Sequence, residues 1–248
     1  MPMGCRMLIG IGMLPIKELL DGFLLMAQNR NEEHEYSSWD KFNHGDGWGY
    51  VVRRKGELKS YRQVAPCWED PEYLSLYHTS FDLILLHARK ASPMLPVDLD
   101  STHPFQMDGW YFCHNGTIYD PDFRNGSDSK KLFYKILESI ALLGDVVEAI
   151  RKTVGEVKNY TALNFILLGG KKAYVLNHYS PEEQHNHPKY YTIKCLETDD
   201  YIIVSSEQLK SLGEGWKQVE NQTLIQIDTQ TLTLKYISPK SHYGKAQR

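Results

Sequence analysis

Two kinds of hydrophobic pattern run along the chain: short continuous runs and stripes with helical spacing. Pro15 opens the first stripe, in which hydrophobic residues recur every three or four positions as far as Ala27, and similar stripes cover 132–140 and 146–154. This spacing predicts three helices. The short runs, which are typical of strands, occupy 7–11, 48–53, 81–89, 109–114, 163–168, 172–176, 190–195, 201–204, 223–227 and 231–236.

The order of these elements favours an α+β fold. Gly169 and Gly170 separate two of the short runs, as the turn of a β-hairpin does. Many hairpin strands with few helices predict antiparallel sheets covered by helices. No repeat or linker divides the sequence, so 1–248 is expected to form a single domain, with 238–248 as a polar, flexible tail.

Composition narrows the functional classes. The 248 residues, 42% hydrophobic and 24% charged, suffice for a substantial core, and a formal charge of −3 gives no reason to expect nucleic acid or an anionic membrane as a partner. No hydrophobic run is long enough to span a bilayer, and the chain start lacks a secretory pattern. Four scattered cysteines fit free thiols in a reducing cytoplasm.

Neither a metal nor a cofactor is expected. His178, His185 and His187 are close together in the sequence, in a segment that reads as a polar loop. Their spacing is not that of a zinc site, and no paired-cysteine motif accompanies them.

Cys5 is the first candidate for chemistry because it lies near the chain start. If the residues ahead of it are removed, it carries both a thiol and a free α-amine, which titrates at about pH 8. Such an amine accepts a proton at neutral pH and can activate the thiol without a histidine. By position alone, Cys5 fits equally a small buried residue at the entry of a strand.

Polar groups at the ends of two predicted strands are further candidates. Arg89 could bind a substrate carboxylate through its planar guanidinium, or form a surface ion pair. Asn115 and Gly116 could present a side-chain amide and a backbone N–H to an oxyanion, or form a plain turn. Cys113 and His114 cannot form a catalytic dyad, because adjacent residues of a strand point to opposite faces.

Two more segments have a structural and a functional interpretation. The glycines of 45–49 either allow a loop to lie close to a ligand or make the turn before a strand. Asp128 stands at the start of a predicted helix, where an N-cap is the default role, although a carboxylate there could also bind a substrate ammonium group.

Taken in order, these segments resemble the class II glutamine amidotransferases, which are N-terminal-nucleophile hydrolases, and most closely the stand-alone branch whose members begin Met-Cys-Arg. The resemblance extends over roughly 5–209, most of the chain. The matching blocks are Cys5-Arg6, Asp46-Gly47-Trp48-Gly49, His87-Ala88-Arg89-Lys90-Ala91-Ser92, Thr102-His103-Pro104-Phe105, His114-Asn115-Gly116-Thr117-Ile118, Ser127-Asp128-Ser129, Leu163-Asn164-Phe165 and Ser206-Glu207.

The resemblance implies a four-layer αββα sandwich and a role for each residue. Cys5 would attack the side-chain amide of a glutamine-like substrate, with its own α-amine as the base, to form a γ-glutamyl thioester and release ammonia. Asn115 and the Gly116 N–H would stabilise the oxyanion. Arg89 would hold the substrate α-carboxylate and Asp128 the α-ammonium group. The other residues expected at the substrate pocket are Gly47, Trp48, Ser92 and His114.

One feature departs from the family pattern. Relatives usually expose the cysteine by removing the initiator methionine alone, whereas 1–4 precede Cys5 here. Either a short propeptide is cleaved, the true start lies elsewhere, or the chain is inactive as written.

Three functions follow as alternatives. The chain could be an amidotransferase with a separate synthetase subunit that accepts ammonia, or a free-standing hydrolase of a γ-glutamyl peptide or conjugate. A non-catalytic glutamine-binding subunit is the third alternative. A homodimer is compatible with the general tendency of soluble enzymes, and nothing in the sequence locates an interface.

Overall fold

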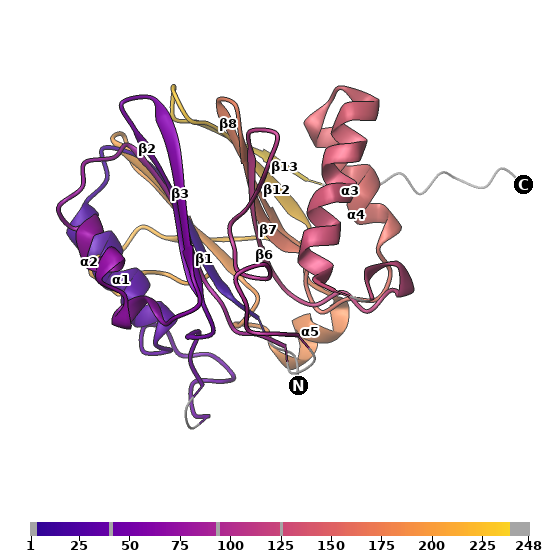
Figure 1. The fold of residues 1–248 in the computed structure, drawn as a ribbon, viewed down its shortest axis with the longest axis horizontal. Helices are drawn as coiled ribbons and strands as arrows, with labels where there is room; N and C mark the ends of the chain where they lie inside the picture. Colours follow the sequence, from indigo (N-terminus) through magenta and orange to yellow (C-terminus); the bar gives the residue numbers. More distant parts are fainter. Residues whose placement is uncertain (1–3, 40–41, 93–94, 125, 239–248) are drawn as a thin grey trace, which may run out of the picture.

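The computed structural model describes residues 4–39, 42–92, 95–124 and 126–238. Most of the expected propeptide and almost all of the expected C-terminal tail lie outside the described residues. The framework is a pair of antiparallel sheets (Figure 1). In spatial order, the first sheet contains β11 (Lys217–Val219), β9 (Ile193–Glu197), β10 (Tyr201–Ser205), β1 (Arg6–Gly12), β4 (Leu83–Ala88), β2 (Trp48–Arg54) and β3 (Glu57–Gln63). The second contains β13 (Thr233–Ile237), β12 (Thr223–Asp228), β8 (Lys172–Asn177), β7 (Asn164–Gly169), β6 (Trp110–Asn115) and β5 (Phe105–Met107).

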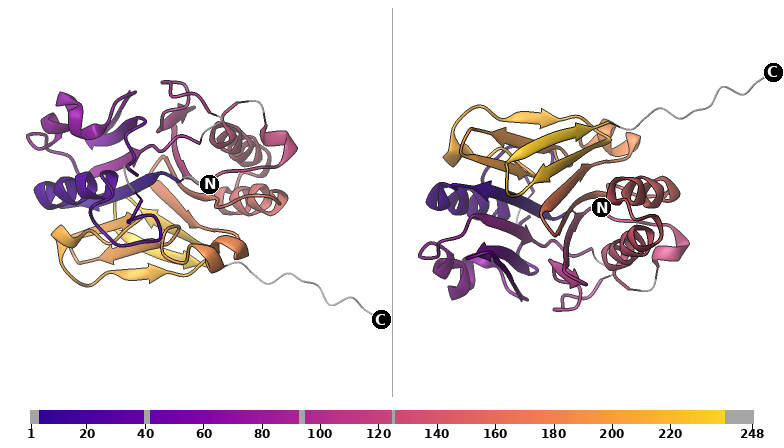
Figure 2. Two further views of the ribbon diagram at one scale, coloured as in Figure 1. Left: turned by 90° about the horizontal axis from the view of Figure 1, so that it is seen from below. Right: turned by 90° about the horizontal axis from the view of Figure 1, so that it is seen from above.

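Helices cover the outer face of each sheet. The helices are α1 (Ile16–Ala27), α2 (Pro71–Leu76), α3 (Asp128–Leu143), α4 (Val146–Glu156) and α5 (Pro181–Asn186). The pair α1 and α2 lies on the first sheet, and the pair α3 and α4 lies on the second, while the two sheets pack against each other between them (Figures 1 and 2). The α+β class and the four-layer αββα sandwich are therefore confirmed.

Alternation along β1 determines which core each side chain enters. Met7, Ile9 and Ile11 pack between the two sheets, whereas Leu8 packs beneath α1. Because successive strand residues point to opposite faces, a residue two positions before Met7 belongs to the set between the sheets. Cys5 therefore begins on the inner side of the sandwich.

Most of the predicted elements are confirmed. The hydrophobic pattern gave one strand a wrong start and did not reveal two other elements. The run 190–195 was too long, because β9 starts only at Ile193 and the two preceding tyrosines are buried in an aromatic cluster instead. The segment 181–186, predicted as loop, forms α5 because Ser180 caps it and Pro181 occupies its first turn. Strand β3 has no hydrophobic run because it lies at a sheet edge and is largely exposed.

The start of α3 corrects the simplest interpretation of Asp128. Ser127 is the N-cap, and its hydroxyl accepts a hydrogen bond from Lys130 N at 3.2 Å. Asp128 is the first helical residue, so its carboxylate is available for other contacts near the positive end of the helix. The helix ends at Gly144, whose left-handed conformation (φ 69°) favours glycine.

Candidate functional site

Cys5 lies at the entry to β1, with only 8% of its surface exposed. Its thiol donates a hydrogen bond to Lys90 O over 3.8 Å. Burial raises the pKa of this thiol to about 11, and the hydrogen bond to Lys90 and the nearby Arg89 guanidinium offset only part of that shift. With residues still attached ahead of it, Cys5 is therefore an un-ionised thiol at neutral pH.

Arg89 projects from the end of β4 onto the same inner side, four residues after Leu85 of the core between the sheets. Its Nη2 donates to Pro96 O at 2.9 Å. Its Nη1 is buried and has no hydrogen-bond partner among the described residues. Buried guanidinium N–H groups are normally paired, so this one is available to an anionic ligand.

The glycine loop before β2 fixes the backbone around Arg89. Gly47 O accepts the Arg89 N–H at 2.8 Å, and Asp46 N donates to Arg89 O at 3.0 Å. Gly47 has φ 138°, and a β-carbon there would lie 2.9 Å from Thr102 Oγ1, so both conformation and space require glycine. Its contribution to the site is thus made by the backbone.

Asn115 is the last residue of β6 in the second sheet, and Gly116 follows it. Asn115 follows Cys113 of the core between the sheets by two residues, so its side chain points to the inner side with Cys5. Its Oδ1 is buried without a hydrogen-bond partner in the described part of the chain. Gly116 has φ 151°, and a β-carbon would overlap Ala162 O.

Asp128 reaches this region from the first turn of α3. Its Oδ2 accepts the Ile118 N–H at 2.7 Å, and its Oδ1 accepts the Ser129 N–H at 2.8 Å. These bonds hold the buried carboxylate in one orientation. Ser92 lies within 3.4 Å of Thr117, hydroxyl to hydroxyl, and so links the segment after Arg89 to the turn after Gly116.

The comparisons with known proteins agree with this architecture. No protein-family model matches the chain. It is 21% identical over 193 residues to gamma-glutamyl-hercynylcysteine sulfoxide hydrolase of Mycobacterium tuberculosis, an alignment that covers 76% of this chain and 78% of that protein. Its fold matches glutamine phosphoribosylpyrophosphate amidotransferase from B. subtilis with a TM-score of 0.63 and 15% identity, over 94% of this chain. The chain spans about half of that enzyme, 49% of its length.

A further match decides the fold. A glutamine aminotransferase class-II domain protein from Silicibacter pomeroyi aligns over its entire chain, 100%, and over 95% of this one, with a TM-score of 0.60 and 17% identity. The chain has the fold of class II glutamine amidotransferases. Cys5, Arg89 and Asn115 therefore lie on the inner side of a sandwich that has the amidotransferase fold.

The structure does not bring every expected side chain to this group. Trp48 is fully buried on the helix side of the first sheet, where its indole N–H donates to Asp70 at 2.9 Å. His114 points to the helix side of the second sheet, because it follows Phe112 of that core, and it contacts Ser129 Oγ at 2.8 Å. These two side chains therefore lie on the opposite faces of their sheets from Cys5, Arg89 and Asn115.

Sequence reasoning missed a buried network beside Cys5. The Nε of Arg6 pairs with Glu207 at 2.8 Å, and both side chains are almost fully buried. The Arg6 guanidinium also lies 4.0 Å over the ring of Tyr190. Arg6 and Glu207 both belong to the blocks that resemble the family, yet residues 201 positions apart cannot be paired from spacing alone.

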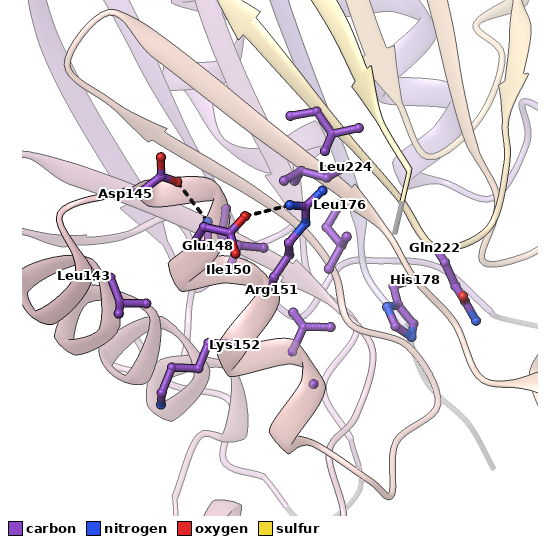
Figure 3. Close-up of a pocket in the computed structure, with 13 residues that line it drawn as sticks. Leu143, Asp145, Glu148, Ile150, Arg151, Lys152, Leu176, His178, Gln222 and Leu224 are labelled. Carbon is purple, nitrogen blue, oxygen red and sulfur yellow. Dashed lines mark hydrogen bonds and ion pairs between the residues drawn. The ribbon is translucent and has the colours of Figure 1, made fainter. Parts of the chain in front are cut away.

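A separate cavity lies away from Cys5, Arg89 and Asn115. A cavity of about 780 Å³ between α4 and the strands β8 and β12 is lined by Arg151, Leu176 and Leu224 (Figure 3). Its charged groups are already engaged, as the Glu148–Arg151 pair at 2.7 Å illustrates. In the described part of the chain, no group of three or more histidine, cysteine, aspartate or glutamate side chains could hold a metal ion. Within the same residues, no helix is long and apolar enough to cross a membrane.

Proposed function

We propose that the chain is a single-domain enzyme that hydrolyses a γ-glutamyl amide through a Cys5 thioester. The observation that carries this proposal is the convergence of Cys5, Arg89 and Asn115 on the inner side of an amidotransferase fold. The Cys5 thiol can act as a nucleophile, and the Arg89 guanidinium can bind a carboxylate. The Asn115 amide at the strand end can contribute to an oxyanion site.

The chemistry requires an α-amine on Cys5. The buried thiol has a raised pKa, so it needs a base to take its proton. Removal of 1–4 would create an amine with a pKa of about 8 on the same residue. The thiol then transfers its proton to this amine and attacks the substrate carbonyl carbon. The protonated amine next delivers that proton to the departing nitrogen.

The remaining groups bind the two charged ends of the substrate and its carbonyl. Arg89 Nη1 would donate to the α-carboxylate, and the fixed carboxylate of Asp128 would accept from the α-ammonium group. Asn115 and the Gly116 N–H would stabilise the oxyanion. Water finally attacks the thioester carbonyl, which releases the γ-carboxylate and restores the Cys5 thiol.

One observation favours a conjugate hydrolase over a partner-dependent amidotransferase. The gamma-glutamyl-hercynylcysteine sulfoxide hydrolase aligns over 78% of its own length, so the resemblance extends over most of that hydrolase. We therefore place a γ-glutamyl conjugate ahead of glutamine as the substrate. If glutamine is the substrate instead, a separate synthetase subunit would accept the ammonia. A homodimer and a cytoplasmic location are further proposals.

The test is intact-mass analysis before and after incubation with a glutamine-analogue electrophile, together with hydrolysis assays on glutamine and γ-glutamyl conjugates. We expect one covalent adduct on Cys5 and none in Cys5→Ala. Cys195→Ala removes another buried thiol and should label like the parent protein. Substrate binding without an adduct or turnover would instead support a non-catalytic glutamine-binding subunit.

A further inference from the structure

A buried hydroxyl group lies close to the backbone nitrogen of Cys5. Tyr190 Oη donates a hydrogen bond of 2.6 Å to Gly4 O, and Tyr190 is only 1% exposed. A carbonyl oxygen is about 2.3 Å from the nitrogen of the same peptide bond. Gly4 O therefore marks a position that is next to Cys5 N and within hydrogen-bond distance of Tyr190.

Groups of the candidate site enclose the space around Gly4. A β-carbon on Gly4 would overlap Asn115 Oδ1, and it would lie 2.9 Å from the Tyr190 ring and 3.2 Å from the Tyr191 ring. The enclosed space thus runs from Cys5 N to the Asn115 amide. When Cys5 is amino-terminal, a small molecule can take the place of Gly4 between these two groups.

Hydrolysis of a Cys5 thioester needs a water in such a place. The water must give a proton to the α-amine, so it must lie beside Cys5 N. It must also reach the thioester carbonyl, whose oxygen would face Asn115. A water near the position of Gly4 O meets both requirements, and Tyr190 Oη already makes a hydrogen bond at that position.

Arg6 holds Tyr190 in one position. The Arg6 guanidinium lies 4.0 Å over the Tyr190 ring, and its Nη1 donates to Tyr190 O at 3.3 Å. Arg6 is itself paired with Glu207 at 2.8 Å. Both the ring and the backbone of Tyr190 are therefore fixed, so its hydroxyl is preorganised to orient a small molecule beside Cys5 N.

His44 decides which way the Tyr190 hydroxyl points. His44 Nε2 is 3.2 Å from Tyr190 Oη, and its Nδ1 is 3.2 Å from Ala27 O. Burial lowers the pKa of His44 well below its ordinary value and raises the pKa of Tyr190, so both side chains are neutral and the imidazole has one N–H. With Gly4 in place, that hydrogen lies on Nε2 and Tyr190 donates to Gly4 O. With the hydrogen on Nδ1 instead, Nε2 accepts from the Tyr190 O–H, and Tyr190 Oη can accept a hydrogen from a water.

We propose that Tyr190, oriented by His44, positions the water that hydrolyses the Cys5 thioester. This inference rests on the proposed function, in which the thioester forms on an amino-terminal Cys5. One hydrogen of the water points to the α-amine and the other to Tyr190 Oη, which leaves an oxygen lone pair directed at the thioester carbonyl carbon. The oxygen adds to that carbon as the amine takes the first proton. The C–S bond then breaks and the sulfur recovers that proton, while the second hydrogen stays on the product carboxyl group until the group ionises.

The experiment separates formation of the thioester from its hydrolysis. It uses a form that begins Met-Cys5 and is otherwise complete, because methionine removal then exposes the α-amine. The substrate is the γ-p-nitrophenyl ester of glutamate, whose good leaving group makes thioester formation fast. Nitrophenolate release should show a rapid first phase, from thioester formation, and a slower steady phase, from thioester hydrolysis.

Tyr190→Phe keeps the ring and removes only the hydroxyl. It should leave the rate and size of the first phase within about twofold and slow the steady phase by about 10- to 100-fold. Intact mass should then show the glutamyl adduct accumulated on Cys5. His44→Leu leaves the Tyr190 hydroxyl in place and removes its acceptor, so it should slow the steady phase alone, by about 3- to 10-fold.

Tyr36→Phe is the matched control. The Tyr36 hydroxyl is buried in the same aromatic cluster and has no hydrogen-bond partner among the described residues, and the ring centroids of Tyr36 and Tyr190 are 4.5 Å apart. This variant should keep both phases at the parent rate. A steady phase at the parent rate in Tyr190→Phe would overturn the inference, as would an equal loss in both phases. Absence of the first phase from the parent form would instead count against the proposed function itself.

Discussion

Replacement of Arg89 by methionine tests the carboxylate clamp directly. Arg89 is 3% exposed, one of its guanidinium nitrogens is committed to Pro96 O at 2.9 Å, and Nη1 is buried without a partner among the described residues. A substrate carboxylate on Nη1 would make a charge-assisted hydrogen bond away from water. Such a bond is worth about 1.5 to 3 kcal/mol, which corresponds to about 10- to 150-fold in kcat/KM.

The assay compares two substrates in the form that begins with an amino-terminal Cys5. Glutamine has the α-carboxylate, and 4-aminobutanamide lacks it but keeps the amide and the ammonium group. Arg89→Met should lower kcat/KM for glutamine by the factor above and leave kcat/KM for 4-aminobutanamide within about threefold. The difference is expected because only glutamine has the carboxylate that we propose Nη1 binds.

Arg62→Met is the matched control. Arg62 also donates to backbone carbonyls of the loop between β4 and β5, at 3.2 Å to Leu99 O and 3.0 Å to Thr102 O. If its removal disturbs that loop, both substrates should suffer equally. An equal loss on both substrates in Arg89→Met would refute the clamp and assign Arg89 a purely structural role.

Three other changes have effects that can be estimated. Gly116→Ala forces a β-carbon into Ala162 O at φ 151°, so urea unfolding should show a loss of at least about 2 kcal/mol. Glu207→Leu leaves the buried Arg6 charge unpaired, with an expected loss of about 3 to 5 kcal/mol by the same assay. Burial lowers the pKa of His87 to about 3. Below pH 6.5 the unfolded chain therefore binds a proton at His87 that the folded chain does not. This difference should lower the free energy of unfolding by about 2 kcal/mol between pH 6.5 and pH 5, and His87→Gln should remove that contribution.

The first two of these changes have controls on the surface. A β-carbon at Gly155 in α4 would meet no atom of the described residues within 4 Å beyond its own helix, so Gly155→Ala should raise stability by about 0.5 to 1 kcal/mol. Glu156→Gln removes an exposed pair with Lys152 and should change stability by less than about 1 kcal/mol. A loss at Gly116 or Glu207 no larger than in these controls, or an unchanged pH dependence in His87→Gln, would contradict the packing and burial on which the estimates depend.

The order of secondary structure could be predicted from the sequence because most elements have a local hydrophobic pattern. Strand β1 is a continuous hydrophobic run, and α1 has a hydrophobic stripe that opens at Pro15. Strand β3 and helix α5 could not be found in this way. The first is mostly solvent-exposed, and the second depends on Ser180 and Pro181 rather than on a hydrophobic stripe.

The identities of the main candidate residues also came from the sequence, since Cys5, Arg89 and the Asn115–Gly116 turn occur in blocks with a recognisable order. What the sequence left open was direction. Trp48 belongs to such a block too, yet its indole is buried on the helix side of its sheet. A one-residue step along a strand exchanges the two faces, and only the packing of the layers decides which face becomes the site.

The sequence by itself thus determined the kinds of element and the chemical groups available, because propensity, periodicity and side-chain chemistry are local properties. Only the tertiary structure decided which groups meet. It brought Arg6 to Glu207 and placed the Tyr190 hydroxyl on Gly4 O, 186 positions away in the chain. Contacts of this kind depend on how two sheets pack face to face, and the burial that gives them their energy does not exist until the layers close.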